Sequence, residues 1–419
     1  MINKDKLANG IIVVTEELPH LRSVALGVWL NKGSRDETEQ LNGVSHFIEH
    51  ILFKGTRKRS GLEIARTIDS IGGQLDGMTG RENICFYARL LDEHLPLAFD
   101  LLSDIVINPL FKKEDIESER KVILEEIKMV EDSPDELIHD LFIASFWQNH
   151  PLGRPVLGTR EIVSKLSRKR MVKYFEKCFV PENIIISAAG HLKHKEVIKL
   201  AQKYFGCLQG VNGLLGSIAP KHKPSIMMVN RNELEQVHLC LGTTSYPINH
   251  PDRYAFHILN VLLGGGISSR LFQDIREKRG LAYSIYSFLN LYSDSGYLAT
   301  YVGTSSRNLT TVIELIIKHI RDIIQGKIEP SELRLVKDHI KGQLMLSLES
   351  SATRMSKLAQ QIIYFKRNFT LDEIIQGIEK VQLEDIQRTA TAFFAGKQFS
   401  LTVLGDVKDK LISPQSLVP

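Results

Sequence analysis

The chain has 419 residues, more than the roughly 250 to 300 over which one hydrophobic core usually grows, so we expect two domains. Its composition, 43% hydrophobic and 24% charged, is ordinary for a globular protein. The net charge of +4 is small for this length and the basic residues are interspersed with acids, which excludes an obvious nucleic-acid-binding surface. No apolar run reaches the roughly 18 residues that a membrane span requires.

Four cysteines, Cys85, Cys178, Cys207 and Cys240, lie far apart and form no CxxC pair. We therefore expect free thiols in a reducing compartment. A first strand is expected from Gly10 to Val14, which leaves no room for a leader peptide. These features predict a cytoplasmic protein, although an organellar protein after leader removal would look the same.

The next element is a helix that starts near Val44 and carries His46-Phe47-Ile48-Glu49-His50. Histidines at i and i+4 can bind one metal ion, and the carboxylate beside them is free to act on a bound water. With glutamate just before the second histidine, the order is that of the inverzincins. A lone histidine is usually a satisfied core residue, and a catalytic zinc needs a third protein ligand, so this hypothesis requires a ligand from another element.

A long helix without glycine or proline is expected from Lys112 to Val130. Its apolar stripe includes Ile116, Ile123, Ile127 and Val130. Glu119 and Glu126 lie two turns apart beside that stripe, whereas Glu125 points toward solvent. A carboxylate at a buried position needs a cation, so Glu126 is the better candidate for the third ligand. A salt-bridged amphipathic helix would show the same pattern without a metal.

Two pairs of segments indicate that the chain repeats itself at an offset near 215 residues. The strand Ile184 to Gly190 resembles Leu401 to Gly405, and Ala25 to Val28 resembles Leu239 to Gly242. Strands such as 85–90 alternate with helices such as 93–105, which is typical of α+β domains. We therefore predict domains at 1–210 and 225–419, joined by a linker at 211–224 that is rich in glycine and proline.

The second half contains no HxxEH motif, and the offset places Val261 to Gly265 at the corresponding position. One metal ion per chain is therefore expected. His/Glu ligation favours Zn²⁺, although availability can substitute Mn²⁺ or Co²⁺.

These motifs resemble the pitrilysin, insulinase and mitochondrial processing peptidase family. In that family HxxEH is followed about 76 residues later by a glutamate, which is the spacing from His50 to Glu126. The flanking segments 41–45 and 51–56 also match. The resemblance implies two homologous domains, each a mainly antiparallel sheet with helices packed on it, arranged as a clam shell.

The resemblance also implies roles for individual residues. His46, His50 and Glu126 would be metal ligands, Glu49 the general base, and Glu119 a carboxylate that supports a ligand. In the second half, Arg276 and Tyr283 match the family's Arg, six residues, Tyr motif, which holds the substrate carbonyl and the developing oxyanion.

Two further segments are expected to contact substrate. Residues 72–82 resemble the family strand whose edge pairs with the peptide, which makes Asp76, Gly77, Thr79 and Glu82 candidates. Relatives usually carry Asn-Ala where this chain has Asp-Gly, and the carboxylate suggests a preference for basic residues nearby. The run Gly264, Gly265 and Gly266 is expected to form a peptide-facing loop before a short helix capped by serine.

Together these features predict a zinc endopeptidase that hydrolyses extended or unfolded peptides inside an enclosed chamber. Short relatives combine the zinc domain of one subunit with the Arg/Tyr domain of another, so a homodimer with shared sites is expected, without nucleic-acid or membrane partners. One alternative is a non-catalytic assembly or peptide-binding subunit of the same fold. Another is a zinc hydrolase that acts on small non-peptide substrates.

Overall fold

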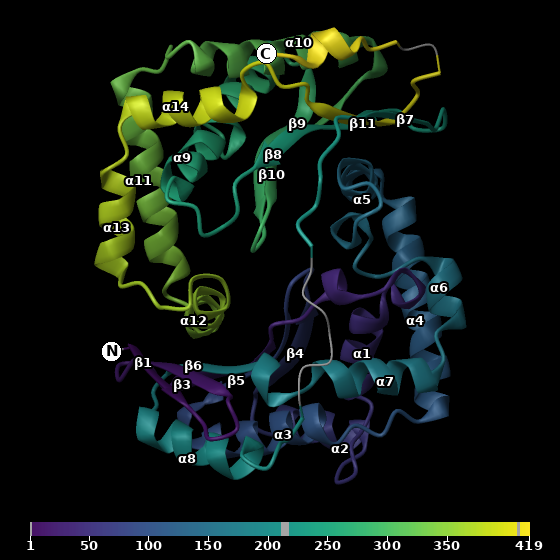
Figure 1. Ribbon diagram of the computed structural model, residues 1–419, viewed down its shortest axis with the longest axis vertical. Helices are drawn as coiled ribbons and strands as arrows, with labels where there is room; N and C mark the ends of the chain where they lie inside the picture. Colours follow the sequence, from purple (N-terminus) through teal and green to yellow (C-terminus); the bar gives the residue numbers. More distant parts are fainter. Residues whose placement is uncertain (1, 211–217, 409–410) are drawn as a thin grey trace. The chain divides into compact units, whose positions relative to one another are not determined.

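The computed structural model describes residues 2–210, 218–408 and 411–419. Its contacts divide the chain into two compact units, each built on one sheet (Figure 1). The first unit comprises Met1–Met129, Arg154–Ile218 and Leu346–Asn368. The second comprises Val130–Gly153, Ala219–Met345 and Phe369–Pro419.

The first sheet has six strands in the order β1-β2-β6-β3-β5-β4. Only β2 and β6 pair in parallel, and the other neighbours are antiparallel. Among the described residues β4 pairs only with β5, so its other edge has no partner strand there and is called the open edge. The strand bounds are Ile2–Lys6 (β1), Ile12–Glu17 (β2), Ser23–Leu30 (β3), Gln74–Thr79 (β4), Ile84–Leu91 (β5) and Ile184–Gly190 (β6).

Both faces of this sheet are covered by helices, and the alternation along β3 shows why. Leu26 and Val28 face the core formed with α1, α3 and α8, whereas Ala25 and Trp29 face α12. Figure 1 shows α12 on one side of these strands and α3 and α8 on the other. The helices of this unit are α1 (Val44–Leu52), α2 (Gly61–Asp69), α3 (Leu95–Ile107), α4 (Lys113–Asp132), α6 (Arg160–Lys165), α7 (Arg168–Cys178), α8 (His194–Phe205) and α12 (Ser351–Phe365).

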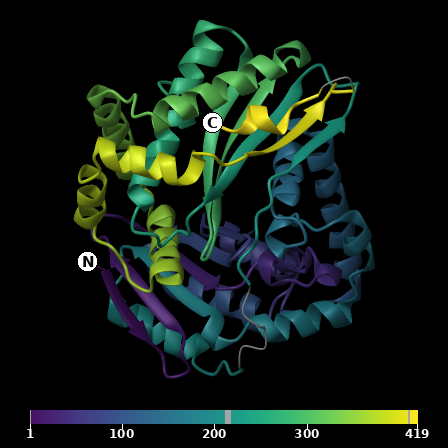
Figure 2. The ribbon, with the colours of Figure 1, turned by 45° about the horizontal axis from the view of Figure 1, so that its top comes forward.

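The second sheet repeats the same topology in the order β7-β11-β8-β10-β9, with β7 and β11 as its parallel pair (Figure 2). The predicted echoes fall on equivalent strands, since β6 corresponds to β11 and β3 to β8. The predicted α+β fold with two similar, mainly antiparallel units is confirmed. The strand bounds are Ile226–Asn230 (β7), Val237–Ser245 (β8), Ala282–Leu291 (β9), Gly296–Thr304 (β10) and Ser400–Gly405 (β11).

Helix α5 covers one face of this second sheet through Ile138, Phe142 and Phe146, which pack against Tyr297 and Leu404. The other helices that belong to this unit form its second core. They are α9 (Arg253–Gly264), α10 (Leu309–Ile324), α11 (Pro330–Ser347), α13 (Leu371–Glu379) and α14 (Leu383–Phe394), and α5 spans Pro134–Phe146.

The units differ from the predicted domains, 1–210 and 225–419, because two segments pack with the opposite half of the sequence. Val130–Gly153 carries α5 to the second sheet, and Leu346–Asn368 carries α12 to the first. Each sheet has two apolar faces, and the helix that covers the second face comes from the other repeat. The predicted linker, 211–224, lies partly outside the described residues.

The four cysteines form no disulfide, and only Cys207 is exposed, which agrees with the free thiols predicted. Among the described helices, none combines the length with the apolar character needed to cross a membrane.

Candidate metal centre and active site

The helix that carries the HxxEH motif, α1, begins at a position that only glycine suits. Gly43 has φ of +90°, and a Cβ there would lie 2.6 Å from the carbonyl oxygen of Leu157. The buried carboxylate of Glu37 then accepts hydrogen bonds from the N–H groups of Gly43 and Ser45, both at 2.8 Å. It therefore satisfies the first turn of α1 and interacts favourably with the helix dipole. Burial raises the pKa of Glu37 to about 7.

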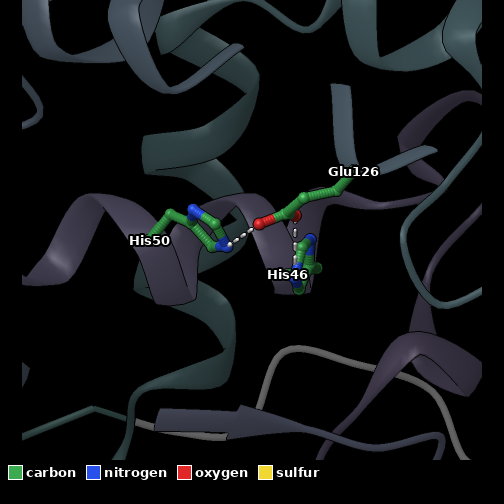
Figure 3. A group of neighbouring side chains, drawn as sticks. All are labelled: His46, His50 and Glu126. Atoms are coloured by element: carbon green, nitrogen blue, oxygen red, sulfur yellow. Dashed lines mark ion pairs between the residues drawn. The ribbon is translucent and has the colours of Figure 1, made fainter. Parts of the chain in front are cut away.

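From this helix the two predicted histidine ligands turn toward one carboxylate on α4 (Figure 3). The Nε2 atom of His50 lies 3.7 Å from Oε1 of Glu126, and that of His46 lies 3.8 Å from Oε2. One ligand atom from each residue falls within a 4.8 Å cluster. Ligands of a single tetrahedral Zn²⁺ lie about 3.3 Å apart, so small side-chain movements would bring these atoms to ligand distance.

Glu119, two turns before Glu126 on α4, contacts the second histidine on the side away from Glu126. Its Oε2 lies 3.1 Å from Nδ1 of His50, and its Oε1 lies 2.7 Å from Nζ of Lys54. The contact with a carboxylate assigns the proton to Nδ1, which leaves the Nε2 lone pair directed at Glu126. The ion pair with Lys54 compensates the charge of the buried Glu119 carboxylate.

The charge states of these groups fit a divalent cation. Burial, followed by the nearby His50, lowers the pKa of His46 to about 4, so its imidazole is neutral at pH 7 and able to bind a metal. Oε2 of Glu126 is buried and has no hydrogen-bond partner among the described residues. Imidazole lone pairs and a carboxylate that converge without a donor between them repel one another, and a cation removes that cost.

The predicted base, Glu49, lies on the same helix and is held by strand β4. The hydroxyl of Thr79 donates to Oε2 of Glu49 at 2.5 Å. A Cβ on Gly77 would lie 2.7 Å from Cγ of Glu49, so glycine at this position leaves room for the base. Burial raises the pKa of Glu49, opposed by the Thr79 hydrogen bond and His50.

Other residues expected to contact substrate have partners within the first unit. Asp76 is exposed on β4 and accepts from the N–H of Gly77 at 2.8 Å. Glu82 is buried and forms an ion pair with Arg35, whose Nη1 lies 2.6 Å from its carboxylate. Glu82 therefore holds the turn after β4 in place, and its predicted contact with substrate stays a prediction.

Arg276 and Tyr283 lie together in the second unit. The guanidinium of Arg276, on the π-helix Phe272–Lys278, lies 5.7 Å from the centre of the Tyr283 ring. Tyr283 is 77% exposed on β9, so its hydroxyl is accessible to a ligand. Their part in binding substrate stays a prediction.

Two of the three glycines before this helix, Gly264 and Gly265, are required for close packing. None of Gly264, Gly265 and Gly266 has a positive φ. A Cβ on Gly264 would lie 2.5 Å from the backbone nitrogen of Ser287, and Gly264 ends α9. The expectation of a serine cap on the next helix is wrong, because no side chain caps it.

Three supporting residues were missed or misread from the sequence. Glu37 lies seven residues before α1, too far for a capping pattern, and nothing in the sequence linked Lys54 to Glu119. Thr79 was expected to contact substrate, whereas it holds Glu49. Alternation along β4 places Thr79 and Gly77 on one face, a signal that could have linked both to the base.

Comparison with known families matches residues 12–160 to the insulinase family, peptidase family M16, and residues 165–340 to the peptidase M16 inactive domain. The uncharacterized zinc protease YmxG of Bacillus subtilis is 39% identical over 419 residues, covering 100% of both chains. An uncharacterized zinc protease of Mycobacterium leprae is 36% identical, covering 98% of this chain and 93% of its own. The chain therefore belongs to peptidase family M16, as its motifs predicted.

Solved structures share the fold. A protease from Helicobacter pylori superposes with a TM-score of 0.89 at 22% identity, covering 97% of this chain and 99% of its own. A peptidase M16 inactive domain from Pseudomonas fluorescens superposes with a TM-score of 0.90 at 19% identity, covering 98% of this chain and 100% of its own. At such identities the likeness concerns the fold alone.

Proposed function

We propose that this protein is a zinc-dependent endopeptidase. The observation that carries the proposal is the convergence of His46, His50 and Glu126 beside a separate carboxylate, Glu49, that is held by Thr79. Three protein ligands leave one position of a tetrahedral zinc open, which is the arrangement of catalytic sites. The names of the relatives as zinc proteases support the same activity.

The residues of the chain divide the chemistry between them. Zn²⁺ in this site would polarise a peptide carbonyl and acidify a water molecule. The carboxylate of Glu49 takes the proton from the attacking water and passes it to the nitrogen of the leaving amine. Thr79 keeps that carboxylate oriented, while Glu119 fixes the proton of His50 on Nδ1.

The substrate we propose is an extended or unfolded peptide that adds a strand to the open edge of β4. Main-chain hydrogen bonds tolerate many sequences, so the activity would be broad. Tyr283 and Arg276 would bind the carbonyl and its developing negative charge from the second repeat. We further propose that the reaction takes place in an enclosed chamber.

The remaining parts of the proposal concern assembly and location. One zinc per chain is proposed because the described residues contain one group of His, Cys, Asp or Glu side chains suited to a metal. A homodimer with sites shared between chains would bring the zinc repeat of one subunit to the Arg/Tyr repeat of the other. A cytoplasmic location is proposed from the free thiols.

Peptide cleavage by metal-free and zinc-reloaded protein tests this function. Reduced, carboxymethylated lactalbumin serves as an unfolded substrate, and a small aromatic ester serves as the non-peptide comparison. Zinc-dependent fragments of lactalbumin are expected. Zinc binding without cleavage of either substrate would favour a non-catalytic, peptide-binding subunit, and ester hydrolysis that lactalbumin does not inhibit would favour a small-molecule hydrolase.

A further inference from the structure

A pocket of about 450 Å³ lies on the face of the first sheet that carries α12. Its lining includes Met78 of β4, Tyr87 of β5, and Ala352, Met355, Lys357 and Gln360 of α12. Helix α12 packs closely on the central strands, because Gly27 has no side chain where a Cβ would lie 2.4 Å from the sulfur of Met355. The pocket therefore opens beside the last strand, β4.

The backbone of β4 shows where a peptide would lie relative to this pocket. The N–H of Gly77 donates to the side chain of Asp76, so it is outside the ladder with β5. Backbone groups of alternate residues point the same way, which directs those of Leu75, Gly77 and Thr79 to the open edge. These are also the residues whose side-chain positions face α1 and Glu49.

A strand added at that edge alternates its side chains between the two faces of the sheet. The peptide residue beside Gly77 projects toward the face of α1. Its sequence neighbours project toward the face of Met78, which is 43% exposed there. A side chain next to the residue that pairs with Gly77 therefore reaches the pocket without any change in the sheet.

We propose that this pocket is a substrate subsite that selects a bulky apolar or aromatic side chain adjacent to the residue paired with Gly77. The proposal rests on the proposed peptidase function.

The lining determines the chemical class of the side chain. The thioethers of Met78 and Met355 and the ring of Tyr87 offer polarizable, apolar contacts that favour aromatic groups. Lys357 disfavours a second cation in the same space, so lysine and arginine are poorer occupants than phenylalanine even though Asp76 accepts a hydrogen bond from Tyr87 nearby.

The test uses quenched peptides of alanine and glycine in which one phenylalanine, or one lysine, is moved through the positions around the cleaved bond. In the wild type, phenylalanine is expected to raise kcat/KM by about tenfold or more at a position next to the residue that pairs with Gly77, and not at the paired residue itself. Ala352→Trp fills the pocket and should remove that gain while leaving the all-alanine peptide unchanged. Lys199→Trp, at an exposed position of α8 on the opposite face, is the matched control that keeps the gain.

Peptide binding to Glu49→Gln protein, followed by fluorescence anisotropy, separates the subsite from the proposed chemistry. The phenylalanine peptide should bind more tightly than the alanine peptide, and Ala352→Trp should abolish this difference. That result would support the subsite even if the wild type cleaved no peptide. Three results would overturn the subsite. Ala352→Trp could weaken the phenylalanine and alanine peptides equally, the wild type could show no preference for phenylalanine in binding or cleavage, or it could prefer lysine equally.

Discussion

Glu125 and Glu126 are neighbours on α4, yet only Glu126 faces His46 and His50, as the helical stripe predicted. Glu126→Gln removes a charged ligand, so it should weaken zinc binding by more than about 100-fold, exceeding the effect of losing a supporting partner. Glu125→Gln is the control, because its side chain is exposed and should leave the affinity unchanged. Competition with a fluorescent chelator measures both, and equal affinities for the two variants would contradict the ligand assignment.

Thr79 is a second residue whose proposed contribution to catalysis can be measured separately. Its hydroxyl donates to the Glu49 carboxylate, and a hydrogen bond to a charged group contributes about 1.5 to 3 kcal/mol. Thr79→Val keeps the shape of the side chain and should lower kcat by about tenfold or more without loss of zinc. Thr79→Ser keeps the hydroxyl and should retain most of the wild-type kcat. If Thr79→Val turned over peptides at the wild-type rate, the base would be oriented by other contacts.

Helix α1 depends on a carboxylate outside its own sequence. The folded pKa of Glu37, about 7, is above its ordinary value of 4.5. Its contribution to stability is therefore complete below about pH 4.5 and is lost as the pH rises through 7, a change of about 3 kcal/mol.

Urea unfolding of metal-free wild type and Glu37→Gln at pH 5 and pH 8 measures this contribution. The wild-type midpoint should fall relative to the variant between these pH values, because glutamine does not titrate. Parallel midpoints at both pH values would show that Glu37 does not titrate in this window.

Most elements near the site could be predicted from periodicity. The stripe of α4, the buried run of β6 and the helix around HxxEH all appear within about two residues of their expected bounds. Strand β1, with the sequence Ile-Asn-Lys-Asp-Lys, was missed because it is polar and pairs only at the edge of the sheet. Local patterns likewise could not show that Lys54 supports the site, since its partner Glu119 is distant in sequence, or that Glu37 does, since it lies too far before α1 for a capping pattern.

Duplication explains the shared topology of the two sheets, and the absence of the HxxEH motif from the second repeat explains why the described residues contain one candidate metal centre. The second repeat keeps the strand order of the first, but α9 ends in glycines where α1 carries its ligands. The sequence predicted this repeat, but it could not show which sheet α5 and α12 cover. Their apolar faces fit any sheet, and the choice depends on packing such as that of Met355 against Gly27.

Subunit mixing tests the proposed sharing of sites between chains. Glu49→Gln and Tyr283→Phe chains are each expected to be inactive or impaired alone, but in a mixed dimer one site would combine the two intact repeats. Random mixing should restore about a quarter of wild-type activity. Mass spectrometry verifies that the subunits have exchanged. If activity then does not recover, both residues belong to a site within one chain.

In the proposed function Glu49 moves the proton while other residues hold the metal. Zinc content and turnover of Glu49→Gln, measured on the same sample, test it most directly. We expect about one zinc per chain, as in the wild type, with kcat lowered by at least about 100-fold. Loss of zinc together with activity, or turnover near the wild-type rate, would contradict the account.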